Sequence, residues 1–220
     1  EPRPGALVPS GGPQYIIPDV YVRKIAGKWQ LALNETSASR LRVNEVYRRM
    51  ISSAKAEDAS YMRAQLQEAR WFIRSLETRN HTVLRVAETI VERQLEFFER
   101  GPEAMQPMVL RDVAEQLELH ESTISRVTRG KYLHCSKGVF EFKFFFSSHV
   151  TTNDGGAASA TAIRAKIKRL ISEEPPRRPL SDAAIAKELN NRGIHIARRT
   201  VAKYREAMNI PSSSDRKHKL

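Results

Sequence analysis

Four basic side chains lie within one ten-residue segment, ARRTVAKYRE, from Ala197 to Glu206. They are Arg198, Arg199, Lys203 and Arg205. An arginine can bind guanine through two parallel hydrogen bonds, and both arginine and lysine bind phosphate. Arg199 and Lys203 are four positions apart, so they share one face of a helix. The segment therefore predicts a helix that contacts double-stranded DNA.

A packing face must hold this helix against the rest of its domain. Its predicted inward stripe is Val201, Tyr204 and Met208. That stripe is expected to face a preceding helix, whose apolar side carries Ile185, Ala186 and Leu189. Gly193 permits the turn between the two helices, and this turn is longer than the usual one. The pattern therefore predicts a variant helix-turn-helix unit.

The outward side chains of the segment differ in their expected contacts. Arg198 lies near the N-terminal end of the helix, whereas Arg205 lies farther along and is better placed for a phosphate. Glu206 can pair with a neighbouring cation or accept from a cytosine amino group. The expected DNA-facing residues are Ala197, Arg198, Arg199, Thr200, Lys203, Tyr204, Arg205 and Glu206. The alternative is a basic helix whose charges are simply solvated.

A second candidate unit is the stretch LRDVAEQLELHESTISRVTRG, from Leu110 to Gly130, which has the apolar spacing of a helix-turn-helix. Its predicted inward residues are Val113, Ala114, Leu117, Leu119, Ile124 and Val127. Ala114 is expected where the two helices cross, because only a small side chain fits there. The candidate DNA-binding residues are His120, Ser122, Thr123, Ser125, Arg126 and Arg129. The alternative is an ordinary helical hairpin in a core.

The preceding part of the chain supplies a hairpin and long helices. Apolar alternation on both sides of Gly27 predicts a small β-hairpin from Val20 to Leu33. From Leu41 the apolar period becomes helical, and Gly101-Pro102 stops it. The aromatic run FEFKFFFSSHV, Phe140 to Val150, is expected to be buried rather than to stack on bases.

The C-terminal part begins after a predicted linker. The segment VTTNDGGAAS, Val150 to Ser159, is small, polar and glycine-containing, which is typical of a flexible connection. An amphipathic helix follows, and Ser181 is expected to cap the next one. The tail SSSDRKHKL is expected to be frayed. These elements predict a mainly α, multi-domain helical protein with long amphipathic helices, a small N-terminal hairpin and two helix-turn-helix units.

Composition limits the classes of function. The chain has 220 residues, and its 37 Lys and Arg against 25 Asp and Glu give a formal net charge of +12. This balance favours an anionic polymer as partner, with nucleic acid first. No apolar run has membrane-spanning length, and no signal peptide is recognised. The single Cys135, the scattered histidines and the lack of a Walker-type phosphate loop predict no metal, no ATP and no other cofactor.

Several motifs resemble one bacterial family. ARRTVAKYRE resembles the RpoN box, the signature of the enhancer-dependent sigma-54 (RpoN) factors of RNA polymerase. The stretches LRVNEVYRRM, EARWFIRSLETRN, PMVLRDVAEQLELHESTISRVTRGKYLH and FEFKFFFSSHV resemble successive parts of the same family. The resemblance runs from about Pro18 to the C-terminus. It implies a transcription initiation factor and not an enzyme, with core RNA polymerase and promoter DNA as partners in the bacterial cytoplasm, at the nucleoid.

The resemblance also implies a division of the chain and roles for its residues. The expected parts are a flexible segment 1–14, a core-polymerase-binding region 15–57, an extra-long helical element with a helix-turn-helix at 58–150, a linker 151–158 and an RpoN-box domain 159–220. The helix from Ala197 to Glu206 is expected to read the upstream GG promoter element. Arg199 is the expected guanine contact, supported by Arg198, Lys203 and Arg205. The unit from His120 to Arg129, led by Arg126, is expected to face the downstream GC element.

One departure from the family pattern leads to a further expectation. The family begins with a glutamine- and leucine-rich segment, followed by an acidic stretch, and a hexameric AAA+ ATPase activator acts on the first of these. Neither segment is found in this sequence. We therefore expect the chain to bind core polymerase and promoter DNA without responding properly to the activator.

Two other classes of DNA-binding protein remain as alternatives. The DNA-binding part of a recombinase or transposase is one, although such an enzyme needs a serine nucleophile or metal-binding carboxylates that the sequence does not show. A free-standing helix-turn-helix repressor is the other, and it binds DNA without polymerase. Copurification with polymerase subunits separates these classes, because only a sigma factor requires it.

Overall fold

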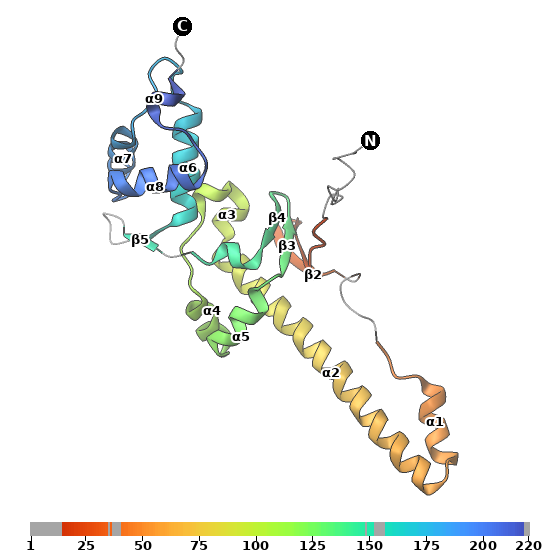
Figure 1. The fold of residues 1–220 in the computed structure, drawn as a ribbon. Helices are drawn as coiled ribbons and strands as arrows, with labels where there is room; N and C mark the ends of the chain where they lie inside the picture. Colours follow the sequence, from red (N-terminus) through yellow and green to blue (C-terminus); the bar gives the residue numbers. More distant parts are fainter. Residues whose placement is uncertain (1–14, 35, 37–40, 148, 152–156, 218–220) are drawn as a thin grey trace, which may run out of the picture.

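The computed structural model describes residues 15–34, 36, 41–147, 149–151 and 157–217. Helices predominate among them, which confirms the mainly α prediction (Figure 1). The predicted flexible segment 1–14 lies outside the described residues, as do residues 152–156 of the predicted linker. No helix in the described ranges is both long and apolar enough to cross a membrane.

The elements divide into a projecting helical pair, a central part around a sheet, and a C-terminal group of helices (Figure 1). The first two parts contain β1 (Val20–Ile25), β2 (Lys28–Leu33), α1 (Glu45–Ser53), α2 (Ala56–Arg93), α3 (Leu95–Arg100), η2 (Pro102–Ala104), α4 (Leu110–Leu117), α5 (Glu121–Thr128), β3 (Tyr132–Cys135), β4 (Gly138–Glu141) and η3 (Phe142–Phe145). The C-terminal part follows β5 (His149–Thr151) and contains β6 (Ala157–Ser159), α6 (Ala160–Ser172), α7 (Asp182–Asn191), α8 (Arg198–Ala207) and α9 (Ser213–Arg216).

The predicted N-terminal hairpin is confirmed, and it belongs to a larger sheet. Strands β1 and β2 pair antiparallel around a turn in which Ala26 and Gly27 have φ of 49° and 79°. Such a two-residue turn has the twist that a hairpin needs. The sheet has the order β2-β1-β3-β4, because β1 also pairs in parallel with β3, with Val20 opposite Leu133.

The carboxylate of Asp19 fastens the hairpin to β3. Its Oδ1 lies 2.7 Å from Nζ of Lys131, and its Oδ2 accepts from the amide of Tyr132 at 3.0 Å. The amide of Asp19 in turn donates to the carbonyl of Tyr132 at 2.8 Å. The hairpin, expected from the sequence in the region 15–57, thus shares a sheet and a core with residues from 58–150.

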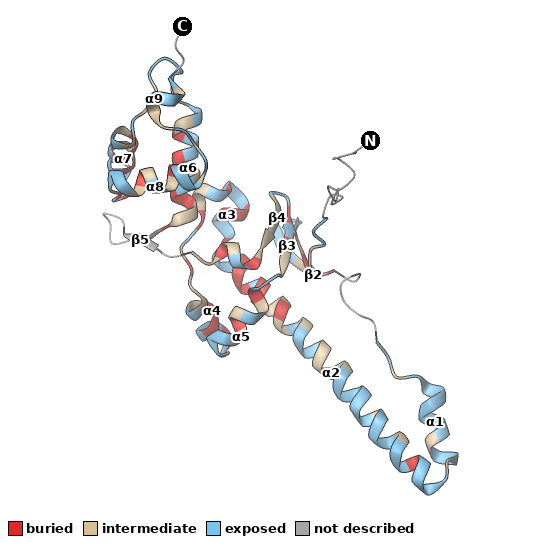
Figure 2. Cartoon of the chain, in the orientation of Figure 1, coloured by how far each residue is buried: buried red, intermediate tan, exposed pale blue. Residues whose placement is uncertain are grey.

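Helix α2 is one uninterrupted helix of 38 residues, about 57 Å long. Apart from Ala59, its buried residues all lie near its C-terminal end: Val83, Val86, Ala87, Thr89, Ile90 and Val91. Figure 2 shows the rest of α2 projecting with α1, with mostly exposed residues. The C-terminal third of α2 therefore anchors the helix in the central core.

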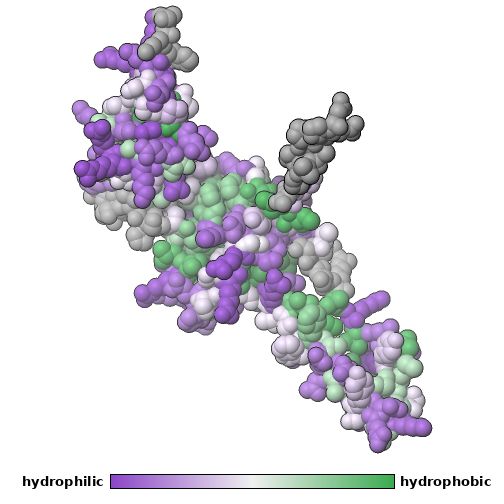
Figure 3. Space-filling model, in the orientation of Figure 1, coloured by the Kyte–Doolittle hydropathy of each residue, from purple (hydrophilic) through white to green (hydrophobic). Residues whose placement is uncertain are grey.

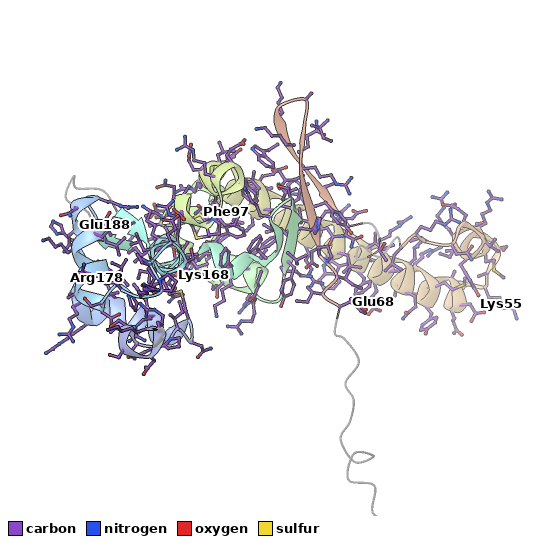
Figure 4. All side chains as sticks on the ribbon, turned by 90° about the horizontal axis from the view of Figure 1, so that it is seen from above. Lys55, Glu68, Phe97, Lys168, Arg178 and Glu188 are labelled. Atoms are coloured by element: carbon purple, nitrogen blue, oxygen red, sulfur yellow. The ribbon has the colours of Figure 1, made fainter. Side chains whose placement is uncertain are left out.

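The burial predicted for the aromatic run is confirmed at Phe142 and Phe145, whereas Phe140, Phe144 and Phe146 are half-buried. Phe142 and Phe145 of η3 have no exposed surface, and neither has Phe97 of α3. The ring of Phe97 lies 5.2 Å from that of Phe145 and 5.3 Å from that of Phe140, both edge to face, a favourable geometry for aromatic rings. Figure 4 places Phe97 in the central part of the molecule. Cys135 is buried in the same core, which agrees with a packing role.

The C-terminal part has its own core, to which three helices contribute. The fully buried residues of this core are Ile163 and Ile167 of α6, Ile185 and Leu189 of α7 and Val201 of α8. Ser181 caps α7, since its hydroxyl accepts from the amide of Ala184 at 3.2 Å, as predicted. This part packs against the central one through α6 and η2, where Arg169 and Glu103 lie 2.8 Å apart.

One expectation for the C-terminal part needs correction, and the predicted linker has a pairing at its ends that the sequence did not indicate. The ends of the predicted linker pair with each other, because β5 and β6 form an antiparallel ladder with Val150 opposite Ala158. The described part of the tail is not frayed: α9 begins at an N-cap, Ser212, and Arg216 forms an ion pair with Glu174. Both contacts join residues that are apart in the sequence, Val150 with Ala158 and Glu174 with Arg216, so local composition did not reveal them.

Candidate nucleic-acid interface

Helix α8 coincides with the basic segment, and its N-cap residue is Ala197. Val201 is fully buried against the core of the C-terminal part, which fixes the inward face of the helix. Arg198, Arg199, Lys203 and Glu206 are exposed, as is Ala197, whereas Thr200 and Tyr204 are half-buried. Five of the eight predicted residues are thus exposed, and the first three of these along the chain lie at the N-terminal end of α8, where the helix dipole favours anions.

Arg205 departs from its predicted role. The residue is only 7% exposed, because its guanidinium points into the domain. Its Nε donates to Oδ1 of Asp182 at 2.9 Å, and its Nη1 donates to the carbonyl of Ile210 at 2.7 Å. The hydrogen bond to Asp182 raises the pKa of the Arg205 guanidinium above its ordinary value. The expected phosphate contact of Arg205 therefore does not fit this geometry, since the donors are already used within the protein.

The spacing of residues along α8 already indicates that Arg205 faces inward. Arg205 follows the buried Val201 by four positions, which places both residues on the same face of α8. The carboxylate that accepts from Arg205 belongs to Asp182, 23 positions earlier in the chain. The helical period alone thus indicates an inward Arg205, but its partner is visible only in the folded protein.

Arg164 is a cation beside α8 that the sequence did not single out. Its guanidinium lies over the ring of Tyr204, 5.2 Å from the ring centre, an arrangement typical of a cation–π contact. Arg164 comes from α6 and is exposed. Figure 3 shows that hydrophilic residues cover much of the visible face of this C-terminal part, whereas apolar residues gather over the central part.

Helices α4 and α5 pack against each other, with a short turn between them. Val113 and Ile124 are fully buried, and Ala114 is 5% exposed. The turn begins at Glu118, which adopts a left-handed conformation with φ of 55°. Because the apolar residues face the core, Ser122 and Arg126 of α5 are left exposed, whereas Thr128 is buried.

The predicted residues of this second unit lie in and around α5. Ser122, Arg126 and Arg129 are exposed, and Thr123 and Ser125 are half-buried. His120 is the N-cap of α5, where its Nδ1 accepts from the amide of Ser122 at 3.2 Å. The ring nitrogen thereby satisfies an amide that lacks a partner inside the helix. His120 therefore has a structural contact besides any contact that it makes with a ligand.

Two arginines of α2 hold α4 in place, and no sequence pattern pointed to them. Arg85 donates from Nη2 to the carbonyl of Leu117 at 3.2 Å. Arg93 donates from Nε to the side chain of Gln116 at 2.8 Å and from Nη2 to the carbonyl of Asp112 at 3.2 Å. These bonds attach the helix that supports α5 to the long helix, so α5 has a defined orientation relative to α2.

The described residues contain no group of three or more histidine, cysteine or carboxylate side chains that could hold a metal ion. A hollow between α1 and α2 has a volume of about 450 Å³, and its lining includes Tyr47, Tyr61, Met62 and Leu66. It lies on the projecting helical pair, away from α5 and α8 (Figure 1). The candidate interface therefore consists of two basic helix surfaces rather than a pocket.

Comparisons with known proteins agree with this arrangement. Residues 59–218 match the family described as "Sigma-54, DNA binding domain", and residues 1–47 match "Sigma-54 factor, core binding domain". The chain is 55% identical over 218 residues to the RNA polymerase sigma-54 factor of Salmonella typhimurium and 54% identical over 218 residues to that of Escherichia coli. These alignments cover 99% of this chain and 46% of each relative, so the chain spans about half the length of these relatives.

A solved structure extends the comparison to the fold. It is described as "Crystal structure of Aquifex aeolicus sigmaN bound to promoter DNA", and it matches this chain with a TM-score of 0.60 at 29% sequence identity. The match covers 93% of this chain and 61% of that one. From the family match over residues 59–218 and the identity to the curated relatives, we conclude that this chain belongs to the sigma-54 family.

Proposed function

We propose that this chain acts within a sigma-54 transcription initiation factor that binds core RNA polymerase and directs it to promoters. In this proposal α8 reads the upstream GG element and α5 faces the downstream GC element. The chain itself performs no catalytic step. Its site of action is the bacterial cytoplasm, at the nucleoid, where polymerase and promoter DNA meet.

One observation carries the proposal: the RpoN-box segment folds as a helix with Val201 buried and with Arg198, Arg199 and Lys203 exposed. A recognition helix needs this division, since its inner face must pack while its outer face enters the major groove. The net charge of +12 supplies the attraction to phosphates that such binding requires. The sigmaN structure described as bound to promoter DNA supports the same partner.

Both reading helices belong to proposed helix-turn-helix units. In the first unit, the turn Glu118 to His120 joins α4 and α5. In the second, the longer turn 192–197 joins α7 and α8, with Gly193 at a φ of 82° that suits glycine. The parts of the chain in this proposal are those expected from the sequence, namely 15–57 for polymerase, 58–150 and 159–220 for DNA, and 151–158 as connection. The family match of residues 1–47 supports the first of these.

We assign the proposed DNA contacts of α8 and α5 first to side chains that are exposed. We assign Arg199 to a guanine of the GG element, with Arg198 and Lys203 beside it on the exposed face. On α5 we assign the leading contact to Arg126, which is exposed and lies four positions after Ser122. The further proposed contacts are His120, Thr123, Ser125, Arg129, Ala197, Thr200, Tyr204 and Glu206.

Copurification with core polymerase tests the proposal against its alternatives. The chain is mixed with core polymerase and with a duplex that carries both promoter elements, and the mixture is separated by size. We expect polymerase, chain and duplex to elute together, and we expect the duplex to leave this complex when both elements are scrambled. A repressor or the DNA-binding part of a recombinase predicts a different result, in which the chain holds the duplex but no polymerase elutes with it.

A further inference from the structure

Arg205 is a cation of the RpoN-box segment that faces inward. Its guanidinium makes a fork with Asp182, in which Nε lies 2.9 Å from Oδ1 and Nη2 lies 3.3 Å from Oδ2. Its third nitrogen, Nη1, donates to the carbonyl of Ile210 at 2.7 Å. The side chain of Arg205 is 8% exposed and that of Asp182 is 20% exposed. The pair is therefore largely shielded from solvent and from any ligand.

These three bonds join three segments of the C-terminal part. Asp182 is the first residue of α7, where a carboxylate is favourable because it faces the positive end of the helix dipole. Ile210 lies just beyond the end of α8, and its own amide donates back to the carbonyl of Arg205 at 3.1 Å. One guanidinium thus connects the beginning of α7 with the chain that leaves α8.

The connection fixes how α8 is turned about its own axis. Val201 and Arg205 are one turn apart on the inner face, and both are held there, one by the apolar core and the other by Asp182. Arg199 and Lys203 are then directed to the outer face. A rotation of α8 that released Arg205 would also move Arg199 and Lys203, because these side chains belong to the same rigid helix.

We propose that Arg205 is a positioning residue that acts through Asp182, and that it sets the orientation in which α8 presents Arg199 to the DNA. The inference rests on the function proposed above and deepens it. Under this account Arg205 contacts no phosphate, and Asp182, an acidic residue in a basic domain, contributes to sequence-specific binding. Lysine cannot replace Arg205, because an ammonium group lacks the planar fork that reaches Asp182 and the Ile210 carbonyl together.

Substitutions at the two positions separate this role from phosphate binding. Asp182→Asn removes a negative charge, so simple electrostatics predicts tighter binding to any DNA. Glu188→Gln makes the same change on the same helix, at a half-buried carboxylate that pairs with Arg192 and not with α8, and serves as the matched control; Glu188 is labelled in Figure 4. Arg205→Lys keeps the positive charge. A phosphate contact would survive this substitution, whereas the fork with Asp182 would be lost.

The dissociation constants are measured for the full chain on a two-element duplex and on one with the GG element scrambled, over a range of salt concentrations. We expect Asp182→Asn and Arg205→Lys each to weaken binding to the intact duplex by roughly tenfold, which is comparable to the loss of one guanine contact. Binding to the scrambled duplex should change little. The slope of affinity against salt is expected to stay at the wild-type value, and Glu188→Gln to bind no more weakly than wild type. Wild-type affinity for Arg205→Lys, or equal losses on both duplexes, overturns the inference.

A measurement on the wild-type protein covers the case in which these variants fail to fold. In nuclear magnetic resonance spectra, the Nε–H signal of Arg205 is expected to be protected from solvent exchange and to stay in place when the intact duplex is added, while that of Arg199 moves. A DNA-dependent shift of the Arg205 signal as large as that of Arg199 contradicts the positioning role. A wild-type chain that does not prefer the intact duplex instead refutes the proposed function itself.

Discussion

Glu174 and Arg216, 42 positions apart, form an ion pair that closes the C-terminal part of the molecule. Nε of Arg216 lies 2.7 Å from Oε1 of the glutamate, and the two side chains are 10% and 7% exposed. Arg216 also donates to the carbonyl of Leu180 at 2.9 Å and to that of Pro211 at 2.6 Å. The last helix is thereby held against the loop between α6 and α7.

Removal of the arginine side chain should destabilise this part of the protein. Arg216→Ala leaves Oε1 of Glu174 and the carbonyl of Leu180 without a donor, although the Leu180 amide still donates to Oε2, and the change costs on the order of 1–3 kcal/mol. Urea unfolding followed by circular dichroism measures the loss. Lys217→Ala, a change at an exposed neighbour, is the control. Equal stabilities of the two variants would show that the ion pair does not hold the tail.

The same pair predicts a dependence of stability on pH. Burial raises the pKa of the Glu174 carboxyl, but hydrogen bonds from Arg216 and from the Leu180 amide outweigh this effect, so the folded pKa is below the ordinary value of 4.5. The stabilisation is thus complete above pH 4.5 and is lost as the pH falls through the folded pKa. Acidification from pH 6 to about 3 should therefore lower the melting temperature of wild type more than that of Glu174→Gln. Parallel pH profiles for the two proteins would contradict this assignment.

Gln94 is a second buried polar residue with a defined role. Its Nε2 donates to the carbonyl of Gln106 at 2.9 Å, and its Oε1 accepts from the Gln106 amide at 3.0 Å. Gln94→Leu leaves both backbone groups without partners, and we expect a loss of about 1–3 kcal/mol in the free energy of unfolding. Chemical denaturation checks the value, with the exposed Gln67 of α2 changed to Leu for comparison. A loss no larger than the control's would mean that water or another group replaces the amide.

Ala114 is the residue that the sequence predicts at the crossing of α4 and α5. The residue is 5% exposed and belongs to the central core. Ala114→Leu adds three carbons at this crossing, which we expect to destabilise the protein by about 1–3 kcal/mol and to weaken binding to the GC element. Binding to the GG element should change little, since α8 has a separate core. Thermal melts and duplexes with one scrambled element test both parts, and Glu115→Leu, at the exposed neighbouring position, is the control.

Much of the fold was predictable because it depends on local patterns. The apolar periods of Val113, Leu117 and Ile124 gave the order of α4 and α5, and Ser181 marked the beginning of α7. What could not be predicted joins residues that are distant in sequence. The parallel pairing of Val20 with Leu133 is an example, because neither strand contains a signal for its partner.

In the candidate site, too, the sequence predicted local features but not contacts between distant residues. Exposure of Arg198, Arg199 and Lys203 followed from the helical period, since Val201 had to face inward. Arg205 was grouped with them by its charge, although its spacing from Val201 indicated the inner face. Charge predicts that a helix attracts DNA, but only the position of Asp182 in the fold shows which arginine is engaged elsewhere.

The most direct test of the account is the binding of Arg199→Ala to a two-element duplex and to a duplex with the GG element scrambled, measured over a range of salt concentrations. If Arg199 reads guanine, the variant should lose about 1–3 kcal/mol of binding free energy on the intact duplex and little on the scrambled one. An equal loss on both duplexes, with a shallower salt slope, would contradict the account, because it would show that Arg199 binds only phosphate.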